Sequence, residues 1–360
     1  MKEIIKIVIT GGPCGGKTSA LPFIEKHFRL IGYNVITVGE SASEILVSQP
    51  QIRCGTEEFQ NAVMSVQLEK EEKAEKSVFG KTLIVCDRGI ADMAAYIDKP
   101  SYEKLIGGTG GNIVSARDRY DAVFHMVTAA EGAEKYYFSG GNSVRMENAQ
   151  QAANLDKRTL AAWVGHNHLR LIDNSTDFNG KVARLISEIE FFLGVPKSLE
   201  IERKFLIKYP DTKLLEKMYN CHCVDIQQVY LTPKDGANRR IRKRGENGYY
   251  VCYFTEKRKI SNIIREEYEK KISEAEYERL MEEADPCRRP ITKKRYCLME
   301  NGTYFEIDVF PFWKDKAFLE VELLDERQSF VIPNYIRVIR DVTKDRKYTN
   351  YALSRKNLIE

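Results

Sequence analysis

The sequence predicts two domains: an α/β domain with a parallel sheet, followed by an α+β domain built on an antiparallel β-barrel. At 360 residues the chain is too long for one ordinary hydrophobic core. Its first half alternates short apolar runs with segments of helical periodicity, as parallel α/β sheets do. After residue 198 the pattern changes to strict alternation over many short segments, which is typical of antiparallel strands.

The composition excludes several classes of protein. Hydrophobic residues make up 43% and charged residues 30% of the chain, so its composition is neither that of a disordered protein nor that of a membrane protein. The 56 basic and 52 acidic residues leave a net charge of +4, which does not indicate nucleic-acid binding. The eight cysteines are scattered, with no pair at zinc-finger spacing. We therefore expect a globular cytoplasmic protein without a membrane segment.

The first domain is predicted to contain five buried strands, at Ile4–Ile9, Val35–Val38, Leu83–Cys86, Ala122–Val127 and Leu169–Ile172. A last amphipathic helix over 181–193 ends at Gly194, and the tetrapeptide 195–198 contains a proline that breaks the pattern. We therefore place the first domain at 1–194, a linker at 195–198 and the second domain at 199–360. Within the second domain, helical patterns occur only near 211–219, near 273–284 and at the C-terminus.

The first apolar run leads directly into GGPCGGKT, which has the spacing of a phosphate-binding P-loop. In such a loop the backbone N–H groups surround the phosphates, Lys17 reaches the terminal phosphates and the Thr18 hydroxyl binds Mg²⁺. The sequence therefore predicts an ATP-binding site made by Gly11, Gly12, Pro13, Cys14, Gly15, Gly16, Lys17, Thr18 and Ser19.

Two carboxylates follow buried strands of the same domain. Asp87 ends the third run, where a carboxylate meets Mg²⁺ or its waters, and Glu40 follows the second run. The base-reading and switch motifs of GTPases are absent, which favours ATP. These features resemble the small P-loop kinase-like ATPases over residues 1–194. The resemblance implies that Glu40 or Asp87 activates a phosphate acceptor and that Arg145 or Arg158 acts as a lid arginine.

For Arg145 and Arg158, a solvated helix face explains the residues equally well. His166 and His168 flank Asn167, and a structural role is the favoured interpretation for both histidines.

The second half carries charged residues at alternate positions on strand after strand. Because side chains alternate between the faces of a strand, each such set lies on one face. The sets are Glu200, Glu202 and Lys204; Arg240 and Arg242; Thr255 and Lys257; Arg265, Glu267 and Glu269; Lys293 and Arg295; Glu306 and Asp308; and Glu320 and Glu322.

For any single strand, an ordinary sheet with its charges in water is the simpler explanation. The whole set favours a closed barrel, because the other face of several strands is strongly apolar and needs its own cover. A barrel with a charged interior and an outer face covered by helices accounts for both observations.

In order along the chain, the motifs EIERK, QVYL, RIR, TEK, REEYE, KKR, EIDVF, EVE and DVTKDRKYTN resemble the CYTH family, the triphosphate tunnel metalloenzymes. The resemblance spans residues 198–358 and implies an eight-stranded tunnel. It implies that Mg²⁺ or Mn²⁺ is bound by Glu200, Glu202, Glu320 and Glu322, and that the triphosphate is bound by Lys204, Arg240, Arg242, Lys257, Lys293 and Arg295. One departure is that PFWKDKAF lacks the glycine common in that hairpin, which leaves the local loop open.

The leading hypothesis is metal-dependent hydrolysis of a triphosphate compound in the tunnel, paired with ATP binding and phosphoryl transfer in the first domain. The substrate is tripolyphosphate, thiamine triphosphate or a nucleoside triphosphate. Cyclisation of ATP, or a non-catalytic sensor that regulates the P-loop domain, stays open as an alternative. RNA binding is disfavoured except at a 5′-triphosphate end.

Two features of the second half stay outside the assigned site. Lys344 in DVTKD is either an interior or a solvated residue. The motif CHC at 221–223 has poor geometry for zinc, so we expect no metal there.

Overall fold

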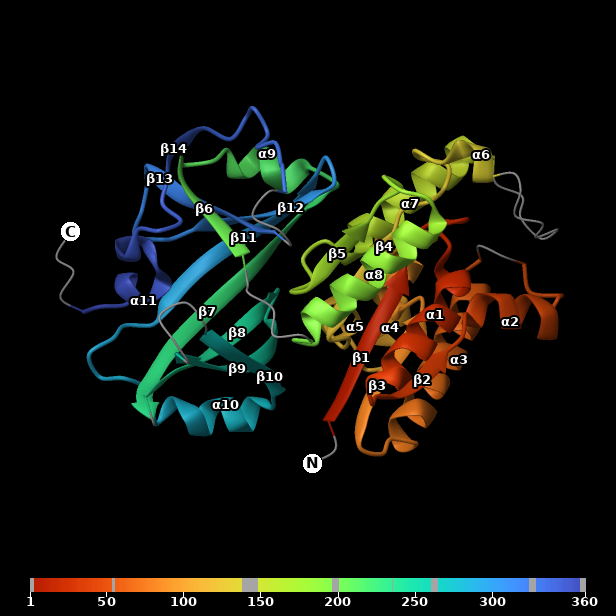
Figure 1. Cartoon of the computed structure of the whole chain (residues 1–360), viewed down its shortest axis with the longest axis horizontal. Coiled ribbons are helices and arrows are strands. Elements are labelled where there is room, and N and C mark those ends of the chain that lie inside the picture. Colours follow the sequence, from red (N-terminus) through yellow and green to blue (C-terminus); the bar gives the residue numbers. More distant parts are fainter. Residues whose placement is uncertain are drawn as a thin grey trace. The chain divides into compact units, whose positions relative to one another are not determined.

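The computed structural model describes residues 3–53, 56–137, 148–195, 201–234, 236–259, 265–323 and 328–356. The chain divides into two compact units, Met1–Lys197 and Ser198–Glu360. Two sheets are formed, one in each unit (Figure 1). None of the helices in the described ranges is long and apolar enough to cross a bilayer.

The first unit has a parallel sheet in the order β2-β3-β1-β4-β5, which confirms the α/β prediction. Its strands lie where the apolar runs predicted them, at β1 (Glu3–Thr10), β2 (Asn34–Val38), β3 (Lys81–Asp87), β4 (Ala122–Met126) and β5 (Leu169–Ile172). The helices are α1 (Lys17–Leu30), α2 (Ser41–Ser48), α3 (Glu57–Lys76), η1 (Ile90–Ala95), α4 (Lys99–Gly107), α5 (Ile113–Arg117), α6 (Glu134–Tyr137), α7 (Ala149–Trp163) and α8 (Phe178–Phe192).

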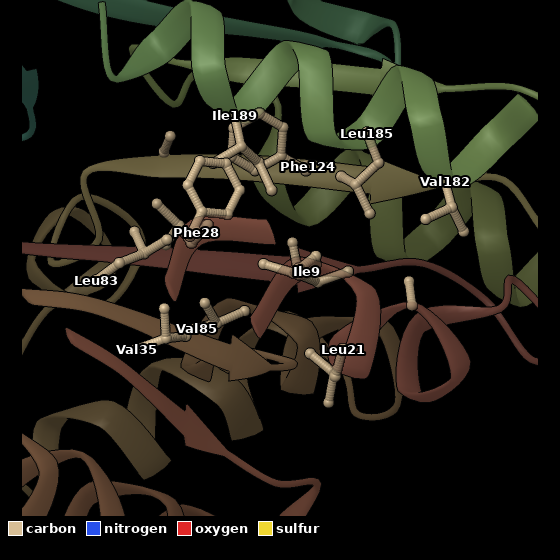
Figure 2. Close-up of a cluster of buried hydrophobic side chains, with 14 of the residues drawn as sticks. Ile9, Leu21, Phe28, Val35, Leu83, Val85, Phe124, Val182, Leu185 and Ile189 are labelled. Atoms are coloured by element: carbon tan, nitrogen blue, oxygen red, sulfur yellow. The ribbon is translucent and has the colours of Figure 1, made fainter. Parts of the chain in front are cut away.

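One face of this sheet is buried under α1 and α8. Figure 2 shows Val182, Leu185 and Ile189 of α8 above the strands, with Ile189 beside Phe28 of α1 and Phe124 of β4. The Asp177 side chain caps α8 by accepting a hydrogen bond from the Gly180 N–H at 2.9 Å, which starts the helix where its apolar stripe meets the core. Because β1 pairs in parallel with β3 and with β4, the carboxyl ends of these three strands lie at one edge of the sheet.

The second unit has one antiparallel sheet of nine strands in the order β10-β9-β8-β7-β11-β12-β13-β6-β14. Its strands are β6 (Ile201–Lys208), β7 (Cys221–Lys234), β8 (Ala237–Glu246), β9 (Tyr249–Lys259), β10 (Arg265–Ile272), β11 (Ile291–Glu300), β12 (Thr303–Val309), β13 (Lys316–Leu323) and β14 (Val338–Asp341). The helices are α9 (Thr212–Lys217), α10 (Glu274–Met281), η2 (Arg346–Tyr348) and α11 (Asn350–Leu353). The antiparallel prediction is confirmed, with one strand more than the eight expected, because the short β14 pairs with β6.

The apolar face of this second sheet forms two clusters. One contains Phe205, Phe305 and Leu319 of the strands together with Leu215 of α9, and the other contains Ile241 of β8 with Tyr277 and Leu280 of α10. The apolar face is therefore the covered outer face, and the charged positions lie on the opposite face.

Because this unit has its own hydrophobic clusters and its strands pair with one another, we predict that a fragment of residues 198–360 folds alone. It should show one cooperative thermal transition by circular dichroism. A fragment that aggregates or melts without cooperativity would mean that the second sheet depends on the first unit.

Candidate functional sites

The loop after β1 has the backbone of a phosphate-binding loop. Gly11, Cys14 and Gly16 all have positive φ, at 138°, 57° and 88°. A Cβ at Gly11 would lie 2.1 Å from the carbonyl oxygen of Met126 on β4, so only glycine fits this position. The glycines of the motif are thus required by the turn itself, before any ligand is considered.

Lys17 is buried at the start of α1 and holds this loop together. Its ammonium donates hydrogen bonds to the carbonyl oxygens of Gly11 at 2.9 Å and Gly12 at 2.8 Å. Burial lowers the pKa of Lys17 to about 8, and the nearby Arg88 cation adds to the lowering. A bound phosphate would offset both effects, because its negative charge would stabilise the protonated ammonium of Lys17.

Asp87 lies at the carboxyl end of β3 beside Thr18. The Thr18 hydroxyl donates to Asp87 Oδ2 at 2.7 Å, while Oδ1 is buried without a hydrogen-bond partner. Burial raises the pKa of Asp87. A buried carboxylate oxygen without a partner is costly, and the hydroxyl and carboxylate are the hard oxygen ligands that Mg²⁺ prefers, so these two residues fit a magnesium site.

Glu40 forms an ion pair with Arg88, the residue after Asp87. Arg88 Nε lies 2.6 Å from Glu40 Oε1, and its NH1 donates to the Gly11 carbonyl oxygen at 3.3 Å. Arg88 has φ 74°, an uncommon conformation for a residue with a side chain. Burial would raise the pKa of Glu40, but Arg88 and Ser43 outweigh it and lower that pKa to about 2.

Two residues of this site, Asp156 and Lys181, were not predicted from the sequence. Asp156 on α7 accepts hydrogen bonds from the N–H groups of Gly12 at 2.5 Å and Thr128 at 3.2 Å. Lys181 on α8 donates to the carbonyl oxygens of Gly15 at 3.1 Å and Val127 at 2.6 Å. Both are single charged residues on otherwise ordinary amphipathic helices, so no local pattern distinguishes them from surface charges.

The structure describes one of the two predicted lid arginines. Arg158 is exposed on α7, and Arg145 lies outside the described residues. His166 is buried with Nε2 3.2 Å from the Tyr120 carbonyl oxygen, and its Nδ1 accepts from the His168 N–H at 3.0 Å. These contacts agree with the structural role expected for the two histidines.

The lowered pKa of Lys17 predicts that ATP binding weakens in alkaline solution. A neutral amine does not pair with phosphate, so each pH unit above about 8 should raise the dissociation constant of ATP by up to about tenfold. Because arginine stays protonated, Lys17→Arg should bind ATP with an affinity that is flat across this range. Titration calorimetry between pH 7 and pH 10 measures both curves. An equal fall in the arginine variant would assign the effect to another group, such as Lys181.

In the second unit, the charged faces of β6, β13, β12 and β11 come together in one ion-pair cluster. Glu320 lies opposite Lys204 on β6 and opposite Glu306 on β12. Lys204 Nζ is 2.5 Å from Glu320 Oε1, and Arg295 NH2 is 2.7 Å from Glu320 Oε2. Burial alone would lower the pKa of Lys204, but the Glu320 carboxylate raises it.

Arg295 is the centre of this cluster. It contacts Asp308 through Nε at 2.6 Å and NH2 at 2.7 Å, and it also contacts Glu306. Lys293 pairs with the same Asp308, which is fully buried. Burial would raise the pKa of Asp308, but Arg295 and Lys293 outweigh it and hold that pKa below its ordinary range. The sequence pattern placed Glu306 and Asp308 on the charged face, but it did not assign either of them to the site.

The basic residues of β8 and β9 lie on the same face as this cluster. Arg240 lies opposite Thr255 and Tyr230, and Arg242 lies opposite Gln228. Arg242 NH2 contacts both oxygens of Glu269, at 3.0 and 3.2 Å, and Glu269 was another carboxylate left unassigned. Lys257, on β9, is half-buried and lies opposite Asn238.

The predicted metal ligands of this unit are only partly described. Glu202 lies directly opposite Glu322, and both are exposed, whereas Glu200 lies outside the described residues. Opposed carboxylates repel each other, which a divalent cation would offset. In the described ranges no three His, Cys, Asp or Glu side chains come close enough to hold a metal ion. The predicted ligands are all carboxylates, whose oxygens suit Mg²⁺ or Mn²⁺. The set of ligands itself stays a prediction.

Two other features of the second unit lie outside the cluster. His222 of the CHC motif pairs with Glu246 at 2.7 Å. Lys344 is exposed, which agrees with the solvated alternative.

Family models match both parts of the chain. An AAA domain model matches residues 6–181, and a CYTH domain model matches residues 198–345. A search of curated proteins found no match.

Several solved structures are similar to parts of the chain. One described as the inorganic triphosphatase NE1496 is 32% identical, covering 43% of this chain and 94% of that chain, with a TM-score of 0.31. The thymidylate kinase of Ehrlichia chaffeensis and the deoxyadenosine kinase of M. mycoides are each 16% identical. Each covers 52% of this chain and 99% of its own, with TM-scores of 0.37 and 0.38. The two family models match one part of the chain each, so the first part is similar to AAA domains and the second to CYTH domains.

Proposed function

We propose that this chain, an AAA domain followed by a CYTH domain, is a metal-dependent triphosphatase that also binds ATP. The observation that carries the proposal is the buried cluster of Lys204, Arg295, Lys293, Asp308 and Glu320 on one face of the CYTH sheet. Buried charges are expensive unless they are paired, and here cations and carboxylates occupy one interior face in quantity. Such a face suits a highly charged substrate together with a cation.

Substrate binding follows from exchange of partners in the cluster. Each cation now lies against a carboxylate, and the oxygens of a triphosphate offer the same charge and geometry as those carboxylates. Arg240 and Arg242, from the adjacent strands, would hold the phosphates. Lys204 and Arg295 would neutralise charge that develops on the transferred phosphoryl group while a water attacks in line.

Glu202, Glu320 and Glu322, with Glu200, would hold Mg²⁺ or Mn²⁺. The bound metal supplies charge neutralisation and a polarised oxygen. Glu320 is now neutralised by Lys204 and Arg295, so it can turn to a metal only when those cations turn to phosphate. We therefore expect the bound substrate to raise the affinity for the metal, and the bound metal to raise the affinity for the substrate.

In the AAA domain we propose that ATP binds over Gly11–Ser19, with Thr18 and Asp87 toward Mg²⁺. Between the two carboxylates considered for phosphoryl transfer, Asp87 has an unpartnered oxygen in place for the metal site. Glu40 then remains for the acceptor. Because its pKa is about 2 while Arg88 pairs with it, Glu40 could accept a proton only after Arg88 turns to a phosphate.

The seven cysteines in the described ranges are all free thiols, which supports a place in the reducing cytoplasm. The proposed substrates are small triphosphates, and an RNA 5′-triphosphate end is the one nucleic-acid substrate compatible with the same chemistry.

A phosphate-release screen tests the proposed function. Tripolyphosphate, thiamine triphosphate and the nucleoside triphosphates are each incubated with Mg²⁺ or Mn²⁺, and phosphate, diphosphate and cyclic AMP are measured. The proposal expects phosphate release from at least one substrate, dependent on the metal. Cyclic AMP in place of phosphate would support the cyclase alternative, and tight binding without turnover would support the sensor.

Arg240→Ala should raise KM for the triphosphate about tenfold or more and change kcat less, because Arg240 would hold phosphate oxygens in both ground and transition states. Arg239→Ala is the matched control. Arg239 is the neighbour on the opposite face and pairs with Glu283 at 2.7 Å, so its loss should leave KM unchanged. Equal kinetics in the two variants would contradict the placement of Arg240.

A further inference from the structure

Two aromatic side chains are exposed beside the phosphate-binding loop. Phe178 is the first residue of α8, Phe23 lies on α1, and they are 39% and 48% exposed. Their ring centroids are 6.5 Å apart and their ring planes are at 76°, so the two rings are in edge contact. We call this pair the aromatic platform. Exposed apolar side chains that gather at one place mark binding sites, whereas single ones need no explanation.

The aromatic platform adjoins the loop directly. A Cβ at Gly16 would lie 2.7 Å from Cε2 of Phe178, so the edge of this ring lies against the residue before Lys17. Phe23 comes one helical turn after Ser19, the last residue of the proposed ATP site, and both are exposed on the same side of α1. The surface of the proposed site therefore continues onto the two rings.

The order of the sheet sets the direction in which a bound nucleotide extends. In-line transfer places the acceptor and the leaving diphosphate on opposite sides of the transferred phosphorus. Glu40, proposed for the acceptor, follows β2, and the sheet order puts β2 and β3 on one side of β1 and β4 and β5 on the other. The nucleoside should therefore extend toward β4 and β5. Helix α8 lies on that side, since it follows β5 and its Lys181 donates to the carbonyl oxygen of Val127, the residue after β4.

The polar side chains next to the aromatic platform already have partners within the first unit. They belong to the segment 173–177, which joins β5 to α8. The Asn174 amide donates to two carbonyl oxygens, at 2.8 and 2.6 Å, and accepts from Lys181 at 2.7 Å. The others are Asp173, Ser175 and Thr176, which contact Arg184, and Asp177, which accepts from the Gly180 N–H. These side chains hold the segment in place, so what they leave for a base is the face of an aromatic ring.

We propose that the base of the bound nucleotide stacks on Phe178, and that the first domain therefore takes purine nucleotides as a class and does not select adenine. The proposal rests on the proposed ATP site over Gly11–Ser19. Stacking reads the face of a base and tolerates changes at its edge, because every base has a π-face. Adenine and guanine differ at their edges and have faces of the same size, whereas a pyrimidine has a smaller face.

A fluorescent reporter at the aromatic platform tests the proposal on the full chain. Phe178→Trp is titrated with ADP, GDP, CDP and inorganic diphosphate in Mg²⁺, because the second domain is proposed to hydrolyse triphosphates. The chain has two native tryptophans, so the wild-type signal is subtracted. We expect ADP and GDP to quench the added fluorescence with dissociation constants within about threefold of each other, and CDP to bind more weakly. Inorganic diphosphate should leave the fluorescence unchanged.

Two results of this titration would overturn the proposal. An affinity for ADP at least about tenfold higher than for GDP would show that the edge of the base is read. Nucleotides that bind without any quenching would place the base away from Phe178.

Phe178→Ala should weaken the binding of ADP and of GDP about tenfold or more, and Phe178→Tyr should restore it. Phe79→Ala is the matched control, because Phe79 is 67% exposed and precedes β3, at the edge of the sheet opposite to the loop. It should bind both nucleotides as the wild type does. Titration calorimetry measures the affinities, and the heat that Lys17→Ala removes identifies binding at the P-loop.

The same titrations separate stacking from a purely structural role of the ring. Inorganic diphosphate has no base, so its Lys17-dependent affinity should not change in Phe178→Ala. An equal loss for diphosphate and ADP would mean that the ring only supports the loop, and would overturn the proposal. So would a Phe178→Ala protein that binds ADP normally but elutes as a smaller species than the wild type, because the rings would then meet a second copy of the chain.

Failure of the ATP site itself gives a different result. If Lys17→Ala binds nucleotide as tightly as the wild type does, the proposed ATP site is wrong and the aromatic platform has no role beside it. If Lys17→Ala loses affinity and Phe178→Ala keeps it, the ATP site stands and only the stacking proposal fails.

Discussion

Replacing Glu320 by glutamine is expected to lower kcat for tripolyphosphate roughly 100-fold or more, with KM unchanged or lower. Glutamine keeps the shape but removes a negative charge between Lys204 and Arg295, which contact its two oxygens. The freed cations should bind the triphosphate at least as well as before. In the proposed site the metal would lose a ligand, so we expect the cost in the chemical step.

The same substitution leaves two buried cations less well paired, so stability has to be measured beside activity. Thermal unfolding should show a folded variant at the assay temperature. Glu283→Gln is the control, since Glu283 pairs with Arg239 on the outer face. A Glu320→Gln protein that is folded, binds substrate and turns over at the wild-type rate would remove Glu320 from the site.

Lys17→Ala is expected to weaken ATP binding roughly 100-fold, because the alanine variant loses the buried cation that the loop directs at the phosphates. The loop itself should also loosen, since the ammonium now joins the carbonyl oxygens of Gly11 and Gly12. Titration calorimetry with MgATP measures the change. Lys26→Ala, an exposed lysine on the same helix, should bind ATP as the wild type does.

If ATP affinity is the same in Lys17→Ala and Lys26→Ala, the phosphates do not lie over this loop. That result would remove the nucleotide site from the AAA domain and leave Thr18 and Asp87 without a role toward Mg²⁺.

The parallel sheet and the P-loop could be predicted because their signals are local. A buried strand of a parallel sheet is a continuous apolar run, and the loop after β1 needs glycine at Gly11 for reasons of backbone shape. The alternation in the second half likewise predicted which side chains share a face, because the period of a strand is two.

The pairings inside the two sites could not be predicted in this way. That Arg295 contacts Asp308, Glu306 and Glu320 depends on the register of β11, β12 and β13, which alternation alone leaves open. Asp156 reaches Gly12 from a helix 144 residues away in the chain. Arg288 donates to the carbonyl oxygen of Tyr351 on α11, a contact between two segments without any shared motif.

The most direct test of the account is tripolyphosphate hydrolysis with Mg²⁺ or Mn²⁺ by the wild type, Glu320→Gln and Lys17→Ala under one set of conditions. The account predicts that Glu320→Gln loses the activity while Lys17→Ala retains it, because hydrolysis belongs to the CYTH domain and ATP binding to the AAA domain. Full activity in Glu320→Gln, with activity abolished in Lys17→Ala, would place hydrolysis in the P-loop domain and contradict the central claim.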